Sequence, residues 1–193
     1  AYLIKVLTAD VDAESKIDLR VNTAATELVM EDGKAVGVKV KNENGEYTIR
    51  AKAVILASGG FGADLDRVAE LKPELAGFVT TNAPTITGDG IDMATAVGAA
   101  TVDMNQIQIH PSVYTETTTA LITEGIRGDG AILVNQEGKR FVNELETRDN
   151  VSAAELAQEG GYAYTILDQK MMYASSTYNG YFTNGYSVQA DSY

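Results

Sequence analysis

The sequence contains no cysteine and a single histidine in its 193 residues. Without cysteine, disulfides, iron–sulfur ligation and thiol nucleophiles are excluded within this chain. One histidine cannot support a histidine-rich metal site, and no group of carboxylates has the spacing of an ion-binding loop, so no metal site is predicted. No apolar run approaches the ~18 residues that a membrane-spanning helix needs, so no transmembrane segment is expected.

Basic residues are also scarce. The chain has 15 lysines and arginines against 27 aspartates and glutamates, which gives a formal net charge of -12 at pH 7. Such a charge repels phosphate backbones and anionic lipid, so a nucleic-acid partner is not expected. A small dianionic substrate can still bind where arginines outweigh this field locally. With 45% hydrophobic and 22% charged residues, the composition is that of an ordinary globular protein.

The first part of the sequence predicts a short helix and a small antiparallel meander. Residues 3–7 favour a helix, and alternation of apolar with polar residues predicts strands. The predicted strands cover residues 17–21, 24–30, 36–40 and 47–50. The nearly continuous apolar run at 52–57 is typical of a strand buried on both faces. It ends at Ser58, Gly59 and Gly60, where the backbone must turn tightly or approach another group closely.

Further helices and strands follow, and the pattern of the sequence changes near Asp103. Helices are predicted at 64–71 and 91–97, the second with Asp89 as its cap. Short strands are predicted at 107–109, 131–134 and 164–167, with a threonine-rich loop at 115–119. Ser152 and Glu155 have capping-box spacing at the start of a helix from about Val151, which Gly160 would end. These elements predict an α+β fold class.

Several segments carry motifs in a fixed order. They are residues 53–62 (AVILASGGFG), 87–91 (TGDGI), 108–111 (QIHP), 123–135 (TEGIRGDGAILVN), 138–144 (GKRFVNE) and 147–149 (TRD). Together they resemble the fumarate reductase/succinate dehydrogenase flavoprotein superfamily. Seven residues separate Arg140 from Arg148, which resembles its soluble, flavocytochrome-type fumarate reductase branch. The chain departs from that branch by one extra residue between His110 and Glu124, and by Ser112 where threonine is usual.

The resemblance implies FAD as the cofactor and fumarate as the substrate. Hydride would pass from N5 of reduced flavin to one alkene carbon of fumarate, and a proton to the other, giving succinate. The implied catalytic residues are Arg148, as the proton donor, with Glu124 and Arg127 relaying protons to it. The implied substrate-binding residues are His110, Thr123, Glu124 and Arg148. The implied cofactor-binding residues are Ala25, Ser58, Gly59, Gly60 and Asp89.

Most of these residues also have a plainer interpretation. A histidine before a proline is often a loop residue hydrogen-bonded to the backbone. Thr123 and Glu124 would cap a short helix, and Arg127 would pair with Glu124 on its surface for ~0.3 kcal/mol. Arg148 would be a solvated residue before a helix cap. We interpret the neighbouring pair of Lys139 and Arg140 as hairpin surface.

The resemblance also implies a division of the chain and further partners. Residues 1–104 would be part of an FAD-binding domain and 105–193 a capping domain that closes over substrate. The family's Gly-x-Gly-x-x-Gly loop and its second substrate histidine and arginine are not found here. We therefore expect a fragment that needs the remainder of the same polypeptide, and that is colourless and inactive alone. A haem or FMN module is an expected electron donor.

Two alternatives remain open at this point. The intact enzyme could reduce another unsaturated carboxylate of the urocanate or acrylate type, although a histidine donor for a second carboxylate favours a dicarboxylate. The chain could also be a catalytically silent folded fragment that binds no FAD on its own, because half of a cofactor site pays the entropy of binding with few contacts.

Overall fold

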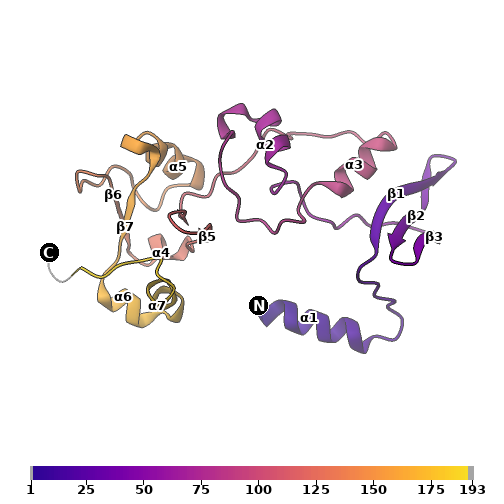
Figure 1. Cartoon of the computed structure of the whole chain (residues 1–193), viewed down its shortest axis with the longest axis horizontal. Coiled ribbons are helices and arrows are strands. Elements are labelled where there is room, and N and C mark those ends of the chain that lie inside the picture. The colour runs from indigo at the N-terminus through magenta and orange to yellow at the C-terminus, as the bar shows by residue number, and fades with distance from the viewer. Residues whose placement is uncertain (1, 191–193) are drawn as a thin grey trace. The chain divides into compact units, whose positions relative to one another are not determined.

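The computed structural model describes residues 2–190 and contains two compact units (Figure 1). Unit 1 extends as far as Phe61 and resumes from Ile86 to Val102; unit 2 comprises Gly62–Thr85 and the chain from Asp103 onward. Helices and antiparallel sheets occur in both, which confirms the predicted α+β class. The domain boundary near residue 104 stays a prediction. No helix formed by residues 2–190 has the length and apolar content to cross a membrane.

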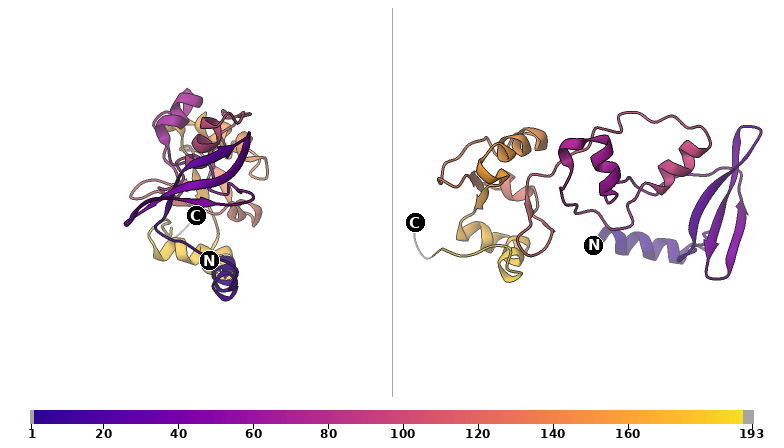
Figure 2. Two further views of the ribbon diagram at one scale, coloured as in Figure 1. Left: turned by 90° about the vertical axis from the view of Figure 1, so that its right-hand side faces the viewer. Right: turned by 45° about the horizontal axis from the view of Figure 1, so that its top comes forward.

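Unit 1 contains a three-stranded antiparallel meander and two helices (Figure 2). Its elements are α1 (Tyr2–Ala13), β1 (Ala24–Glu31), β2 (Lys34–Asn42), β3 (Gly45–Arg50) and α3 (Asp89–Ala96). The turn from β1 to β2 consists of Asp32 and Gly33, both with positive φ, the two-residue geometry that matches strand twist. α3 packs on β1. The predicted meander is therefore confirmed from Ala24 onward, and the predicted N-terminal helix extends to Ala13.

Unit 2 is built from short elements joined by long loops. It begins with α2 (Leu65–Leu71) and the 3₁₀ turn η1 (Pro73–Leu75). Two small antiparallel pairs follow, β4 (Val113–Tyr114) with β5 (Ala120–Leu121), and β6 (Ile132–Val134) with β7 (Tyr164–Ile166). The remaining elements are α4 (Gly125–Gly128), α5 (Arg148–Leu156), η2 (Glu159–Gly161), α6 (Gln169–Ala174) and α7 (Ser176–Thr183). The predicted elements at 64–71, 131–134 and 164–167 are confirmed within one or two residues.

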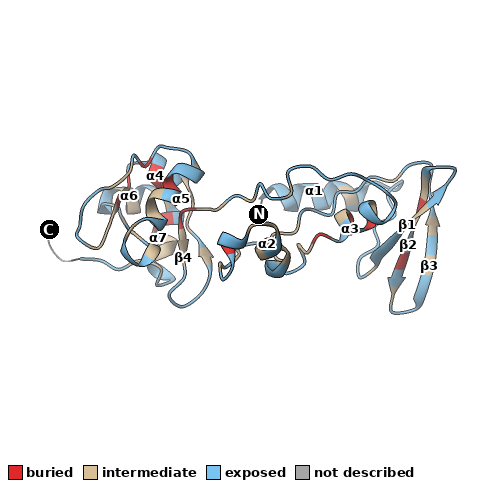
Figure 3. Cartoon of the chain, turned by 90° about the horizontal axis from the view of Figure 1, so that it is seen from above, coloured by how far each residue is buried: buried red, intermediate tan, exposed pale blue. Residues whose placement is uncertain are grey.

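The core of unit 2 lies around α4 (Figure 3). Ile126, Ala131 and Tyr178 are buried together, and half-buried apolar side chains from α6 and α7 pack against them. Val151 of α5 is completely buried as well. Because α4 has only four residues, it depends on this packing rather than on its own hydrogen bonds.

Three predicted strands, at 17–21, 52–57 and 107–109, are wrong. None of them pairs with a strand among residues 2–190. The run at 52–57, expected to be buried on both faces, leaves Ile55 89% exposed. Apolar content and alternation indicate which residues suit a strand, but a strand exists only where a neighbour supplies the hydrogen-bond ladder.

Two predicted helix starts are also wrong. Asp89 is the first residue of α3, and the cap is Gly88, whose φ of 92° places it in the left-handed region. α5 begins before Val151, with Thr147 as its cap, so Ser152 and Glu155 lie inside the helix. Spacing of three residues marks one helix face as well as a capping box, and Ser152 is buried on that face.

Candidate active site

The predicted site residues fall into two groups, one in each unit. Ala25, Ser58, Gly59, Gly60 and Asp89 belong to unit 1. His110, Thr123, Glu124, Arg127 and Arg148 belong to unit 2. No three histidines or carboxylates among residues 2–190 are grouped so that they could hold a metal ion.

The group in unit 1 gathers at the start of α3. A Cβ added to Gly90, in the first turn of α3, would collide with Ser58 Oγ, and a Cβ added to Gly59 would lie 3.4 Å from Ile86 Cδ1. Gly59 has a φ of 83°, which a side chain would strain. The Ser-Gly-Gly turn therefore lies against the N-terminus of a helix, where free N–H groups favour an electron-rich ligand atom.

A hollow of about 600 Å³ lies between β1 and α3. Its lining comprises Ala25, Thr26, Glu27 and Leu28 of β1 with Asp89, Asp92, Met93, Ala96 and Val97 at α3. A β-bulge interrupts the register of β1 between Ala25 and Glu27, next to the hollow. Carboxylates on the wall accept hydrogen bonds from hydroxyl and amino groups and repel phosphate. The hollow therefore fits the sugar or base portion of a dinucleotide rather than its pyrophosphate.

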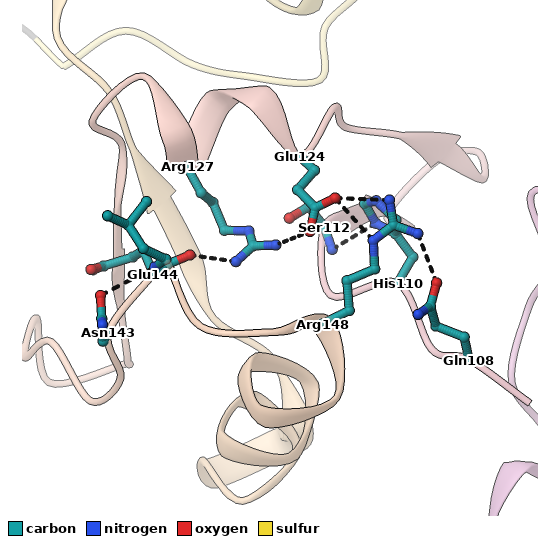
Figure 4. A network of polar contacts seen from close by, with 9 residues as sticks. Gln108, His110, Ser112, Glu124, Arg127, Asn143, Glu144 and Arg148 are labelled. Carbon is teal, nitrogen blue, oxygen red and sulfur yellow. Dashed lines mark hydrogen bonds and ion pairs between the residues drawn. The ribbon is translucent and has the colours of Figure 1, made fainter. Parts of the chain in front are cut away.

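The group in unit 2 is an ionic network centred on Glu124 (Figure 4). Glu124 Oε1 accepts a hydrogen bond from Arg127 Nη2 at 2.8 Å. Glu124 Oε2 accepts from Nε and Nη2 of Arg148 at 3.0 and 2.8 Å. Arg148 Nη1 also donates to Gln108 Oε1 at 2.7 Å. One carboxylate thus joins two guanidinium groups, and Arg148 is held by three of its nitrogens.

Arg148 occupies the first position of α5, where the helix dipole disfavours a cation. Its ion pair with Glu124 offsets this unfavourable position. The hydrogen bond to Glu124 raises the pKa of Arg148 above its ordinary value, although partial burial opposes the shift. The hydrogen bond from Arg148 in turn lowers the pKa of Glu124, which is therefore ionised at neutral pH.

Arg127 is not the surface ion-pair partner that its spacing suggests. Its side chain is only 2% exposed, and its Nη1 donates to the carbonyl oxygen of Glu144 at 2.5 Å in addition to the Glu124 contact. Its Nε has no hydrogen-bond partner among residues 2–190. Glu124 makes no side-chain capping bond to α4, so the plainer capping interpretation is wrong for this carboxylate.

A second ion pair, between Arg140 and Glu144, adjoins this network, because the carbonyl oxygen of Glu144 binds Arg127. Glu144 Oε1 accepts from Arg140 Nε and from the Leu133 N–H, both at 3.0 Å, and Oε2 accepts from Arg140 Nη2 at 2.6 Å. The surface interpretation is confirmed for Lys139, which pairs with the exposed Glu137, and for Arg140, whose exposed side chain also pairs with the buried Glu144. Sequence reasoning gave Glu144 no role; its spacing of four residues from Arg140 was the available signal.

Glu144 should make folding stability depend on pH. The hydrogen bonds from Arg140 lower its pKa to about 2, from 4.5 in an unfolded chain. The stabilisation is therefore fully present above pH 4.5 and is lost as the pH falls toward 2. Glu144→Gln should lower the free energy of unfolding by about 2–3 kcal/mol at pH 7, and by much less near pH 2. Denaturant titrations across this range measure it, with Glu137→Gln at the exposed pair as the control. Equal pH profiles for the two variants would contradict the assignment.

His110 lies beside the network, half-buried (Figure 4). Its Nδ1 accepts a hydrogen bond from the Ser112 N–H at 3.2 Å, so the ring proton resides on Nε2 and can be donated. Burial and then the charge of Arg148 lower the pKa of His110, so the ring is neutral at neutral pH. The structure thus brings Glu124, Arg127 and Arg148 into direct contact, with His110 within their electrostatic influence.

His110 also lines a hollow of about 360 Å³ that lies wholly within unit 2. Most of its wall is apolar, and Glu155 and Ser152 contribute polar atoms. Burial raises the pKa of Glu155 to about 7. Ser152 Oγ and Glu155 Oε2 have no hydrogen-bond partners among residues 2–190.

Gln108 is a further residue that sequence reasoning missed. It stands two positions before His110 in an extended segment, and side chains two apart in such a segment point to the same side. That spacing was the available signal. Its contact with Arg148 joins residues forty positions apart, which no local pattern predicts.

Comparison with known proteins identifies the family of this chain. Residues 2–185 match the family model described as FAD binding domain. The chain is 46% identical over its whole length to a fumarate reductase (cytochrome) of Shewanella frigidimarina, of which it covers 34%. It is 42% identical, over 99% of its length, to an NADH:fumarate oxidoreductase of Klebsiella pneumoniae, of which it covers 20%. It is 41% identical, over 83% of its length, to a urocanate reductase of Eggerthella lenta, of which it covers 28%.

A solved structure is similar to this chain as well. The open conformation of a flavocytochrome c3 fumarate reductase superposes with a TM-score of 0.72 at 37% identity, over 93% of this chain and 32% of that one. The chain spans about a third or less of the length of these relatives. From the family match, the chain belongs to the FAD binding domain family, and it is similar to fumarate reductase flavoproteins.

Proposed function

We propose that this chain supplies the proton-delivery residues and part of the flavin site of an FAD-dependent fumarate reductase. The observation that carries the proposal is the bridge formed by Glu124 between Arg127 and Arg148, with the Nε2 proton of His110 beside it. Two guanidinium groups around one carboxylate leave a net positive charge beside a neutral donor, which suits an anionic substrate, whereas the overall charge of -12 would repel it. We also propose that residues 1–104 act in FAD binding and 105–193 as the cap over substrate.

FAD, when bound, supplies the hydride. Ser58, Gly59 and Gly60 would let it approach the backbone, and Asp89 and Ala25 would line its sugar or base portion. This assignment is supported by the absence of a side chain at Gly90, where the Ser58 turn meets α3.

The residues of unit 2 would bind the substrate and supply its proton. Negative charge grows toward one carboxylate of fumarate as the hydride arrives, and donors fixed in advance stabilise it. His110, through Nε2, and Thr123, through its hydroxyl, would be such donors. Arg148 would give a proton to the other alkene carbon, and Glu124 would replace that proton, with Arg127 next in the relay.

An arginine is an unusual acid because it keeps its proton to pH above ~12. The contact with Glu124 raises the pKa of Arg148 further, so no free base accumulates at rest. The proton can leave only toward a strongly basic carbon. Once it leaves, Glu124 loses its strongest partner and its own proton affinity rises. Glu124, ionised at rest, would then take up a proton from Arg127, which would be resupplied from solvent, and pass it to Arg148 through the existing hydrogen bond.

Another unsaturated carboxylate is the second candidate, favoured by the 41% identity to a urocanate reductase. The electron donor is also open to proposal, since the two fumarate-reducing relatives are described by different donors, cytochrome and NADH. A haem or FMN module of the whole protein would pass electrons from either donor to FAD. The test is to supply the whole protein with reduced viologen and compare fumarate, urocanate and acrylate. Fumarate should give the largest kcat/KM, and preference for a monocarboxylate would reject the dicarboxylate assignment.

Gly90→Ala should weaken FAD retention in the whole protein about tenfold. The new methyl group would force Ser58 away from the start of α3, and overpacking of this kind costs ~1–3 kcal/mol. Flavin absorbance per chain after dialysis measures retention. Gly180→Ala, in α7, is the matched control because its Cβ would meet no atom within 4 Å. Equal flavin content in both variants would separate the Ser-Gly-Gly turn from the cofactor.

A further inference from the structure

Two tyrosines of α7 reach the two ends of α4. Tyr181 Oη accepts a hydrogen bond from the Thr123 N–H at 2.8 Å, just before α4 begins. Tyr178 Oη donates to the carboxylate of Asp129, just after α4 ends. The two rings stack with centroids 6.3 Å apart, so they form one rigid block within the core of unit 2.

This block compensates for the weakness of α4. A helix of four residues has few internal hydrogen bonds, and no side chain caps its N-terminus. The Thr123 N–H would lack a partner without Tyr181, since it precedes the first turn. Tyr181 is half-buried against the core, so its hydroxyl is held in place and cannot be replaced readily by solvent.

The position of Thr123 determines where the next residue, Glu124, can place its carboxylate. Both oxygens of Glu124 are already used, one for Arg127 and the other for Arg148, at 2.8–3.0 Å. A shift of the backbone at Thr123 therefore lengthens at least one of these hydrogen bonds. Misplacement by ~1 Å can cost an active site as much as ~10²-fold in rate.

We propose that Tyr181 is a positioning residue, whose hydroxyl holds the Thr123 backbone so that Glu124 stays bonded to Arg148. Tyr178 differs, because its hydroxyl fixes the far end of α4 and contributes to stability alone. The inference rests on the proposed function, since Tyr181 acts on turnover only if the Glu124–Arg148 pair delivers a proton.

The test compares Tyr181→Phe with Tyr178→Phe in the whole protein. Each variant loses one hydroxyl from the same helix. Tyr181→Phe should lower kcat for fumarate about tenfold with KM changed less than about threefold, and should enlarge the solvent deuterium isotope effect on kcat, because proton delivery becomes slower. Tyr178→Phe should lower the melting temperature and leave kcat within about twofold of wild type.

A second measurement does not depend on activity. Hydrogen exchange of the Thr123 amide should be slow in wild type and in Tyr178→Phe, and at least about tenfold faster in Tyr181→Phe. Unchanged exchange, or unchanged kcat with an active wild type, would overturn the positioning role. A wild type without fumarate reductase activity would instead reject the proposed function itself, while the exchange result would still report on the hydrogen bond.

Discussion

Arg148→Lys should reduce kcat for fumarate by about 10³-fold in the whole protein, within the range for loss of a general acid. KM should change by less than about tenfold, because lysine keeps the positive charge that attracts the dianion. A single ammonium cannot contact Glu124 and Gln108 through three fixed nitrogens as the guanidinium does. The proton of the lysine would therefore be misplaced relative to the alkene carbon in the protonation step.

Steady-state kinetics with reduced viologen measure both constants for Arg148→Lys. Arg140→Lys is the matched control, since Arg140 also makes a paired contact with a carboxylate but lies outside the proposed relay. That control should lose stability and keep kcat within about threefold. Equal losses in kcat/KM and in substrate affinity for Arg148→Lys would show that Arg148 clamps the substrate rather than protonating it.

His110→Ala should lower kcat/KM for fumarate by about 10²-fold, the effect of losing one donor to a charged group. Crotonate carries a methyl group where fumarate has its second carboxylate, so its slow reduction should barely change. The decisive quantity is therefore the ratio of kcat/KM for fumarate to that for crotonate, measured in wild type and variant.

Ser112→Ala is the matched control for His110→Ala. It keeps the backbone N–H that orients the imidazole and removes only a buried hydroxyl from the same loop. The fumarate-to-crotonate ratio should be unchanged in this control. If His110→Ala also leaves the ratio unchanged, His110 only braces its loop, and the dicarboxylate assignment loses its main support in this chain.

Local sequence patterns correctly predicted the strands whose pairing partner is a neighbour along the chain. The meander from Ala24 to Arg50 follows from alternation and turn residues, because each strand pairs with the next one along the chain. The run at 52–57 has the composition of a buried strand, yet no neighbouring strand lies among residues 2–190, so it remains extended and exposed. Composition therefore identifies residues that suit a buried strand, but it does not show whether a partner strand is present.

The same distinction applies to the candidate site. The motifs predicted Glu124, Arg127 and Arg148 as a group, and the ion pairs among them are present. Gln108 and Tyr181 were not predicted, because each acts on a residue forty or more positions away. Such contacts arise only from tertiary packing, and no spacing rule along the chain encodes them.

The most direct test of the account is a crystal structure of the whole protein with FAD and succinate bound. The account predicts one succinate carboxylate within hydrogen-bond distance of His110 Nε2, and the guanidinium of Arg148 facing a central carbon of succinate while still bonded to Glu124. Two results would contradict it. One is succinate bound away from His110, and the other is an Arg148 guanidinium that contacts only a carboxylate of succinate and is turned away from its central carbon atoms.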